Sequence, residues 1–160
     1  MPLRLALYQP DIPQNAGTML RMCACLDITA VIIEPASFPV SDRAFRRAGM
    51  DYLDAVAIER HASFAAFEAW RASMGFRLLL LSTTGDEPYA AFDYRPDDIL
   101  MVGRESAGVP QVVHDAASAR LFVPMRPLMR SLNVAVCAAM AVGEALRQLN
   151  GFEALASAPA

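Results

Sequence analysis

The chain has 160 residues, of which 55% are hydrophobic and 19% are charged, and its formal net charge at pH 7 is −3. This length suits one domain, and the apolar fraction excludes a disordered protein. The small acidic net charge argues against binding of nucleic acid or anionic lipid through the overall charge of the protein. All 14 basic residues are arginine, so a local arginine cluster that binds phosphate stays a candidate feature. The base composition of the genome is the alternative reason for the absence of lysine.

Nothing in the sequence indicates a membrane, secreted or metal-binding protein. No apolar run reaches the ~18–20 residues of a membrane span, and the first residues lack a signal-peptide pattern, so we expect a cytoplasmic protein. Cys23, Cys25 and Cys137 lie in apolar surroundings, and His61 and His114 are separated from them in the sequence. This pattern predicts neither a disulfide framework nor a metal site.

Apolar runs of strand length alternate with segments of helical periodicity along the chain. The predicted strands are residues 3–8, 30–34, 55–58, 76–81, 99–102 and 121–123. The predicted helices are residues 15–26, 41–49, 63–74, 110–117 and 132–149, and Asn15, Ser41 and Ser131 stand where N-caps are expected. Residues 85–97 are predicted to be a loop. Six strands interleaved with helices predict a single α/β domain over residues 1–150, with a parallel sheet covered on both faces, and a flexible tail at 151–160.

The last helix is apolar on every side from Val134 to Gly143 and becomes polar only at Glu144. A helix that is apolar all round must be buried on all sides, which is difficult to arrange within 160 residues. The pattern therefore favours a homodimer interface. The alternative is an internal helix that lies beneath a long loop.

Three segments follow predicted strands, where parallel sheets bind their ligands. In the first, at 13–21, Asn15, Gly17 and Arg21 form either a site or a capped helix with a surface arginine. In the third, at 123–133, a proline-rich loop leads to a serine that either contributes to a site or only caps the last helix. The segments contain no Ser/His/Asp set, no Cys/His pair and no paired catalytic carboxylates. They therefore lack the residues that hydrolase mechanisms require.

The second segment, residues 103–110, contains two glycines that permit close approach of the backbone to a ligand. No Lys-Ser/Thr pair follows Gly108, so the segment is not a nucleotide-triphosphate loop, and it does not match the dinucleotide-binding pattern. Glu105 would repel phosphate groups and accept hydrogen bonds from hydroxyl or amine donors. A neutral or cationic ligand therefore fits this loop better than a polyphosphate.

Taken together and in this order, the segments resemble the three motifs of the SPOUT-class (SpoU-type) RNA ribose 2′-O-methyltransferases. The matching residues are Asn15, Gly17 and Arg21 in the first motif, Gly103, Glu105 and Gly108 in the second, and Ser131 and Asn133 in the third. Further similarity lies at residues 46–52 and 144–149, and the resemblance covers about residues 3–150. The short chain is most similar to the bacterial members that methylate the wobble nucleotide of tRNA.

The resemblance implies an α/β SPOUT methyltransferase domain whose C-terminal part is threaded as a deep trefoil knot, and a homodimer. It implies S-adenosyl-L-methionine as the cofactor and the ribose 2′-hydroxyl of cytidine-34 or a modified uridine-34 in tRNA as the acceptor. The residues that it assigns to the cofactor pocket are Leu81, Ser82, Thr83, Gly103, Glu105, Gly108, Val123, Met125, Ser131, Leu132 and Asn133. The alternative is an α/β enzyme or binding protein that uses S-adenosylmethionine with a non-tRNA substrate; a non-catalytic RNA-binding module is a third hypothesis.

The resemblance assigns activation of the 2′-hydroxyl to Arg21. Because arginine is effectively never deprotonated in proteins, the alternative is that Arg21 binds the adjacent phosphate and stabilises the developing alkoxide. The candidate contacts for the anticodon stem-loop are Asn15, Arg43, Arg46, Arg47 and Arg130, and the alternative for the arginines is a solvated basic face. The chain departs from its relatives at Ala135-Val136, where a Ser-Asn pair is common, and at Gly143, where a tyrosine is common.

Overall fold

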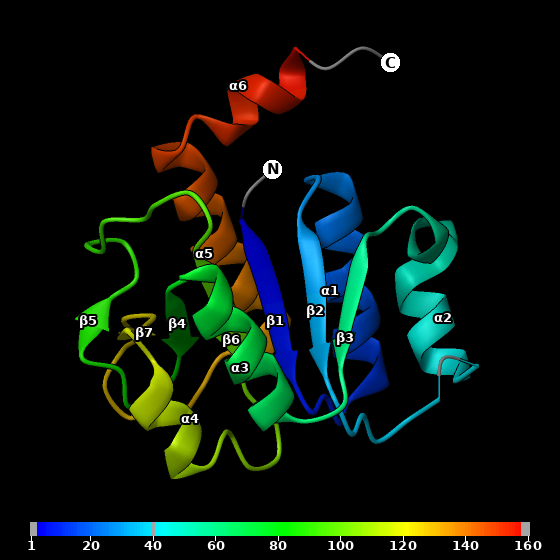
Figure 1. The fold of residues 1–160 in the computed structure, drawn as a ribbon, viewed down its shortest axis with the longest axis horizontal. Coiled ribbons are helices and arrows are strands. Elements are labelled where there is room, and N and C mark those ends of the chain that lie inside the picture. Colours follow the sequence, from blue (N-terminus) through cyan, green and yellow to red (C-terminus); the bar gives the residue numbers. More distant parts are fainter. Residues whose placement is uncertain (1–2, 40, 158–160) are drawn as a thin grey trace.

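A sheet of seven strands forms the centre of the molecule in the computed structural model, which describes residues 3–39 and 41–157 (Figure 1). The strands are β1 (Arg4–Tyr8), β2 (Thr29–Ile33), β3 (Ile58–His61), β4 (Leu78–Leu81), β5 (Glu87–Pro88), β6 (Ile99–Val102) and β7 (Ala119–Phe122). Their spatial order is β3-β2-β1-β6-β4-β7-β5, and every neighbouring pair is parallel. The predicted α/β fold with a parallel sheet is thus confirmed.

Helices cover both faces of this sheet. The helices are α1 (Pro13–Cys25), α2 (Arg43–Gly49), the 3-10 helix η1 (Met50–Asp54), α3 (Phe64–Met74), α4 (Gln111–Ala116), α5 (Val134–Gln148) and α6 (Gly151–Ala156). Buried residues of α1, α2 and α5 share one core cluster, and buried residues of α3 and α4 belong to the cluster on the other face. Within the described residues, no helix combines the length and the apolar character that crossing a membrane requires.

The strand β1 shows how the sequence builds this two-sided core. Leu5 and Leu7 enter the cluster with α1 and α5, whereas Ala6 and Tyr8 enter the cluster with α3. Successive side chains of a strand point to opposite faces, so a strand buried on both sides must be apolar at every position. This is why the central strands are continuous apolar runs.

Several predicted boundaries differ from the structure. The third strand starts at Ile58 and not at residue 55, because residues 50–54 continue α2 as a 3-10 turn and only 58–61 pair with β2. The predicted loop at 85–97 contains β5, a two-residue strand beside β7, which is too short to produce a periodic pattern. Helix α1 begins at Pro13, since proline is favoured in the first helical turn, so Asn15 lies inside the helix and does not cap it.

The N-cap of α2 is Asp42, whose carboxylate accepts a hydrogen bond from the Phe45 N–H at 3.0 Å, and not the predicted Ser41. Serine and aspartate are equally good caps, so the sequence could not separate two neighbours of this kind. The predicted tail contains α6 and continues to residues 158–160, which lie outside the described residues.

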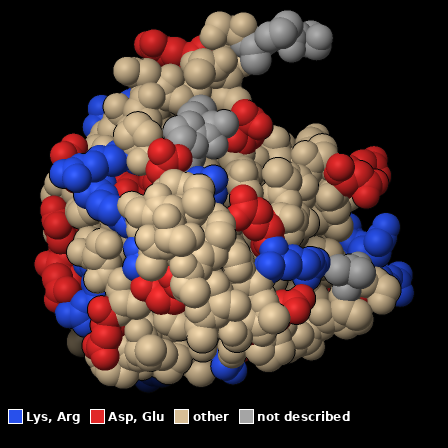
Figure 2. All heavy atoms as spheres, viewed as in Figure 1, with Lys and Arg blue, Asp and Glu red and all other residues tan. Residues whose placement is uncertain are grey.

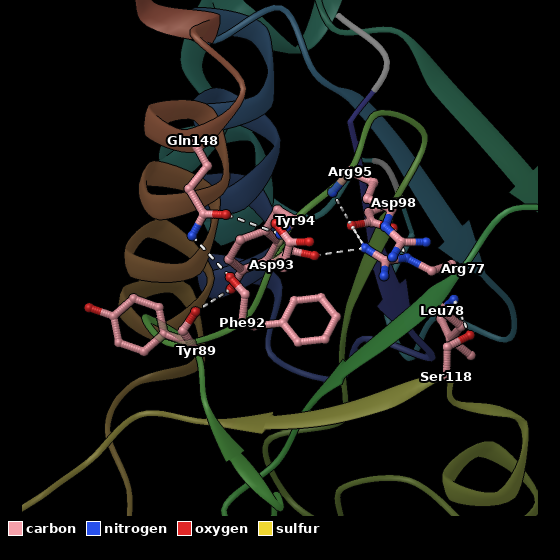
Figure 3. Close-up of polar contacts among 10 residues, drawn as sticks. All are labelled: Arg77, Leu78, Tyr89, Phe92, Asp93, Tyr94, Arg95, Asp98, Ser118 and Gln148. Atoms are coloured by element: carbon pink, nitrogen blue, oxygen red, sulfur yellow. Dashed lines mark hydrogen bonds and ion pairs between the residues drawn. The ribbon is translucent and has the colours of Figure 1, made fainter.

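The long connection between β5 and β6 is attached to the core by polar side chains (Figure 3). Gln148 of α5 accepts a hydrogen bond from the Tyr94 N–H at 3.1 Å and donates one to the Phe92 carbonyl at 3.0 Å. At the start of β6, the buried carboxylate of Asp98 accepts two hydrogen bonds from the Arg77 guanidinium, both at 2.7 Å. These contacts satisfy backbone and charged groups that would otherwise be buried without partners.

Candidate functional site

A cavity of about 780 Å³ lies at the carboxyl ends of β4, β6 and β7. The loops that follow these three strands form most of its wall, and residues of α1, α4 and α5 complete it. All eleven residues that the resemblance assigned to the cofactor pocket line this one cavity, together with Asn15 and Arg130. The sequence shows the three motif segments only in their order along the chain. The structure brings parts of all three together at one cavity.

The loop 103–108 folds back on itself as a tight turn. The Arg104 N–H donates to the Gly108 carbonyl at 3.1 Å, and the Gly108 N–H donates to the Arg104 carbonyl at 2.8 Å. Gly108 has a φ of 62°, and a Cβ on Gly103 would lie 2.9 Å from the carbonyl carbon of Gly108. Both glycines are thus required by the turn itself, before any ligand is considered.

Glu105 sits at the centre of the site. Its side chain is half-buried, and its Oε1 accepts a hydrogen bond from Asn15 Nδ2 at 3.1 Å. Its Oε2 is buried without a hydrogen bond from any described group. Burial, followed by the neighbouring carboxyl group of Asp11, raises the pKa of Glu105 to about 7. Glu105 is therefore a carboxyl group that titrates near neutral pH, not a permanent anion.

The third segment meets the first through Asn133. Asn133, and not the predicted Ser131, caps α5: its Oδ1 accepts from the Ala135 N–H at 2.8 Å. Its Nδ2 donates to Asn15 Oδ1 at 3.0 Å. A continuous hydrogen-bonded chain of Asn133, Asn15 and Glu105 thus joins the three motif segments at the cavity wall.

Gly17 contributes to the site through helix packing. A Cβ at this position would lie 2.4 Å from the Phe45 carbonyl oxygen and 2.8 Å from the Ala48 Cβ, so only glycine lets α1 and α2 approach this closely. Gly17 therefore fixes where α1 presents Asn15 on one side and Arg21 on the other.

We expect Gly17→Ala to lower the free energy of unfolding by about 1–3 kcal/mol, because backbone atoms of α2 cannot move aside cheaply. Urea unfolding followed by circular dichroism measures the change. Gly143→Ala in α5 is the matched control: nothing lies within 4 Å of its added Cβ, so about 0.5–1 kcal/mol of stabilisation is expected from helix propensity. Equal effects of the two substitutions would contradict this role of Gly17.

Arg21 lies outside the cavity. Its Nη1 is 3.1 Å from Met50 Sδ, and its guanidinium carbon is 4.9 Å from the centre of the Tyr52 ring. Both neighbours are exposed residues of η1. The fold of the chain therefore does not bring Arg21 to the motif residues at the cavity, and the predicted catalytic role of Arg21 stays a prediction.

The other predicted RNA contacts fall into two groups. Asn15 and Arg130 line the cavity, whereas Arg43 and Arg47 line a separate groove between α1 and α2, and Arg46 is exposed on α2. Figure 2 shows basic side chains over α2 at the right edge of the molecule, while acidic and basic groups are mixed over the rest of that face.

Residues at or beside the cavity that were not among the predicted site residues include His114, Cys137 and Asp11. His114 lines the cavity from α4, and its Nδ1 is buried without a hydrogen bond to any described group. Cys137 lines it from α5, and burial raises the pKa of its thiol. Asp11 lies next to Glu105, and its position directly after the first strand is the signal that could have identified it. Among the described residues, no group of three or more His, Cys, Asp or Glu side chains could hold a metal ion.

Comparisons with known proteins agree with this geometry. A relative from Beijerinckia indica, described as a tRNA (cytidine(34)-2′-O)-methyltransferase, is 66% identical over 155 residues, which cover 97% of each chain. A solved structure concerned with the 2-OH methylation of C/U34 on tRNA superposes with a TM-score of 0.86 at 41% identity, over 93% of this chain and 97% of that chain. An AdoMet-bound rRNA methyltransferase from Sinorhizobium meliloti superposes with a TM-score of 0.85 at 26% identity, over 92% of this chain and 56% of that chain.

The match to a family model extends across the whole sheet. It covers residues 2–143 and so includes all three motif segments and every strand of the fold. The resemblance inferred from the motifs is thereby confirmed. The chain belongs to the SpoU rRNA Methylase family.

Proposed function

We propose that the protein is an S-adenosylmethionine-dependent tRNA methyltransferase that acts on the ribose 2′-hydroxyl of nucleotide 34, a cytidine or a uridine, in the cytoplasm. The observation that carries this proposal is the meeting of the three motif segments at one cavity through Asn133, Asn15 and Glu105. The relatives with this substrate in their descriptions cover almost the full length of the chain.

The residues of the cavity suit S-adenosylmethionine, which supplies an activated methyl group on a cationic sulfonium. Leu81, Leu121 and Val123 offer apolar walls for an adenine ring, and Ser82 and Thr83 offer hydroxyl groups. Glu105 has a buried oxygen, Oε2, that no described group satisfies. A carboxyl group in this place disfavours a polyphosphate and suits a ligand with amine or hydroxyl donors.

The chain's own residues position the reactants, exclude water and stabilise developing charge. Asn15 and Asn133 hold fixed amide orientations at the cavity wall, because each uses its other end for a second hydrogen bond. Arg21 is exposed on α1 beside Met50 and Tyr52, where its guanidinium can reach the RNA backbone and stabilise the negative charge that develops on the ribose oxygen.

We also propose a homodimer. Leu132, Val136 and Met140 are spaced four residues apart along α5 and the loop before it and are 41%, 47% and 37% exposed, so the described part of the chain covers this stripe only in part. An apolar stripe of this kind is a typical interface feature. A partner protomer would cover it and bring a second Arg21 into the assembly.

We expect Met140→Arg to convert the protein from about twice its chain mass to 17.4 kDa in light scattering, because an isolated charge in an apolar interface is not tolerated. Val112→Asp is the matched control, since Val112 is an exposed apolar residue on α4, away from this stripe. A wild-type mass of one chain would contradict the dimer.

The family's knot is a further part of the proposal: the chain after β6 would be threaded as a deep trefoil. The gathering of the loops after β4, β6 and β7 around one cavity supports it. Stretching the chain from its two ends in optical tweezers tests it, because a knotted chain extends to a shorter contour than an unknotted chain of equal length.

Transfer of a labelled methyl group tests the reaction itself. Purified protein is incubated with labelled S-adenosylmethionine and tRNA from cells that lack the corresponding gene, and nucleosides are analysed by mass spectrometry. Label in a 2′-O-methylated nucleoside at position 34 is expected. Cofactor binding without any label in tRNA would favour a different acceptor, and no cofactor binding would contradict the proposal.

Arg43 and Arg47 of the groove between α1 and α2 are the proposed phosphate-binding residues outside the cavity. Each alanine substitution is expected to reduce the slope of log affinity for tRNA against log salt by about one unit for each phosphate that is no longer neutralised. Arg95→Ala is the control, because Arg95 is exposed at the opposite end of the sheet, before β6. An unchanged slope would assign the arginine to a solvated face.

A further inference from the structure

Asp11, in the loop between β1 and α1, connects this loop to the loop after β6. Its Oδ1 accepts a hydrogen bond from the backbone N–H of Glu105 at 3.2 Å, and its Oδ2 accepts one from the Ser106 hydroxyl. Both hydrogen bonds join residues more than ninety positions apart in the sequence. Asp11 therefore anchors the tight turn that carries Glu105.

The carboxyl groups of Asp11 and Glu105 are also neighbours, and each shifts the pKa of the other. Two adjacent carboxylates repel each other, so such a pair keeps one proton over a wide pH range. Burial and the neighbouring Asp11 raise the pKa of Glu105 to about 7, whereas the neighbouring Glu105 lowers the pKa of Asp11. Glu105 is thus the member of the pair that keeps a proton toward neutral pH, and Asp11 is the charged member.

The other charged groups near Glu105 have different positions or partners. The Arg104 guanidinium bonds to Gln9 Oε1 and lies 5.9 Å from the centre of the Tyr8 ring. His114 and Arg130 line the cavity, and no ion pair joins either of them to Glu105 in the described part of the chain. Asp11 is therefore the ionisable group that contacts Glu105 directly.

The hydrogen bonds beyond Glu105 have one consistent direction. Glu105 Oε1 takes the amide donor of Asn15, which leaves Asn15 Oδ1 to accept from Asn133 Nδ2. Asn133 Oδ1 then remains to cap α5. Rotation of any one amide would place donor against donor, so the orientation of the whole chain depends on where Glu105 is held.

We propose that Asp11 is a positioning residue for the cofactor site: by anchoring Glu105 and Ser106, it holds Asn15 and Asn133 in one orientation at the cavity wall. The inference rests on the proposed function, which makes this cavity the place of S-adenosylmethionine. Without the Asp11 carboxylate, the three motif segments would stay close together but be free to reorient.

Calorimetric binding of S-adenosylmethionine to the full chain, from pH 6 to 8.5, tests this role. D11A removes both acceptors and is expected to weaken binding about tenfold at pH 6.5, as for a charged hydrogen bond left unmade. In the wild type, affinity should fall about eightfold between pH 6.5 and 8.0, because the protonated fraction of a group with a pKa near 7 decreases that steeply.

The D11N variant distinguishes the effect of the negative charge of Asp11 from the effect of its hydrogen-bond acceptor. Its side-chain oxygen still accepts from the Glu105 N–H, but the absence of the negative charge lets Glu105 ionise at lower pH, so its affinity should be nearly constant over that range. E153Q removes an exposed carboxylate on α6 and should keep the wild-type pH dependence. If D11A does not fold, the pH dependence of S-adenosylmethionine binding to D11N tests the proposal by itself.

Stability of the cofactor-free protein is a second readout. In the wild type, folded Glu105 keeps its proton while unfolded Glu105 loses it above its ordinary pKa of 4.5, so the free energy of unfolding should fall from about pH 5 to 7 and then level off. D11N should show a smaller fall. A wild type that does not bind S-adenosylmethionine overturns the proposed function and this inference together; a wild type that binds it while D11N keeps the full pH dependence overturns this inference alone.

Discussion

Replacement of Arg21 by alanine is expected to lower kcat for tRNA methylation about 10²–10³-fold, the effect typical of one electrostatic donor removed from a transition state. The guanidinium is exposed and packs on Met50 and Tyr52, so its removal leaves no buried group without a partner. Binding of S-adenosylmethionine should not change, because Arg21 does not line the cavity. Steady-state kinetics and calorimetry measure the two quantities separately.

The pattern of the kinetic effect distinguishes the two roles of Arg21. Stabilisation of the developing alkoxide predicts a lower kcat with KM for tRNA nearly unchanged, whereas phosphate binding alone predicts a higher KM. Arg21→Lys keeps the charge but not the planar fork, and should recover only part of the activity. Arg95→Ala is the control for removal of an exposed arginine. A folded Arg21→Ala variant with full turnover would exclude both roles.

Asp98→Asn is expected to produce the largest decrease in stability, about 3 kcal/mol, because it removes one partner of a buried ion pair. Asp98 is 1% exposed, and its carboxylate accepts two hydrogen bonds from Arg77 at 2.7 Å and one from the Arg95 N–H at 2.8 Å (Figure 3). Asparagine can accept at one atom only, so the guanidinium would lose its counter-charge and its bidentate geometry.

Asp97→Asn provides the matched control at the adjacent position. Asp97 is half-exposed and lies 3.6 Å from Arg4, and asparagine tolerates its φ of 68° as aspartate does, so stability should decrease by less than about 1 kcal/mol. Urea unfolding of both variants measures the difference. Equal decreases would show that the buried pair contributes no more than a surface one.

How well a sequence pattern predicts the ends of a strand or helix depends on whether neighbouring residues alone determine those ends. Strands β1, β2, β4 and β6 are apolar apart from Arg4 and Thr29 at the first positions of β1 and β2, because both faces are buried, and all four were predicted within two residues at each end. The two-residue strand β5 depends on its partner β7 alone, and no local pattern marks it. Caps were misplaced by one or two residues where neighbouring side chains, Ser41 and Asp42 or Ser131 and Asn133, are equally able to cap.

The functional site likewise contains residues that the local sequence predicted and residues that it did not. The motif residues were found from the sequence because their types and spacing are local properties of three short segments. Asp11 was missed, since its importance comes from hydrogen bonds with Glu105 and Ser106 across the sheet. Arg21 was grouped with Asn15 by spacing along the chain, yet the two side chains leave α1 on different sides, so only Asn15 reaches the cavity.

The sequence by itself determined the parallel α/β architecture and the three candidate segments, because alternation, apolar runs and motif spacing are written in neighbouring residues. Only the tertiary structure decided which atoms meet. The hydrogen bonds of Asn15 with Glu105 and with Asn133 join residues 90 and 118 positions apart, and they depend on the order in which β1, β6 and β4 lie side by side. That order comes from the packing of whole strands and helices, which no short window of sequence contains.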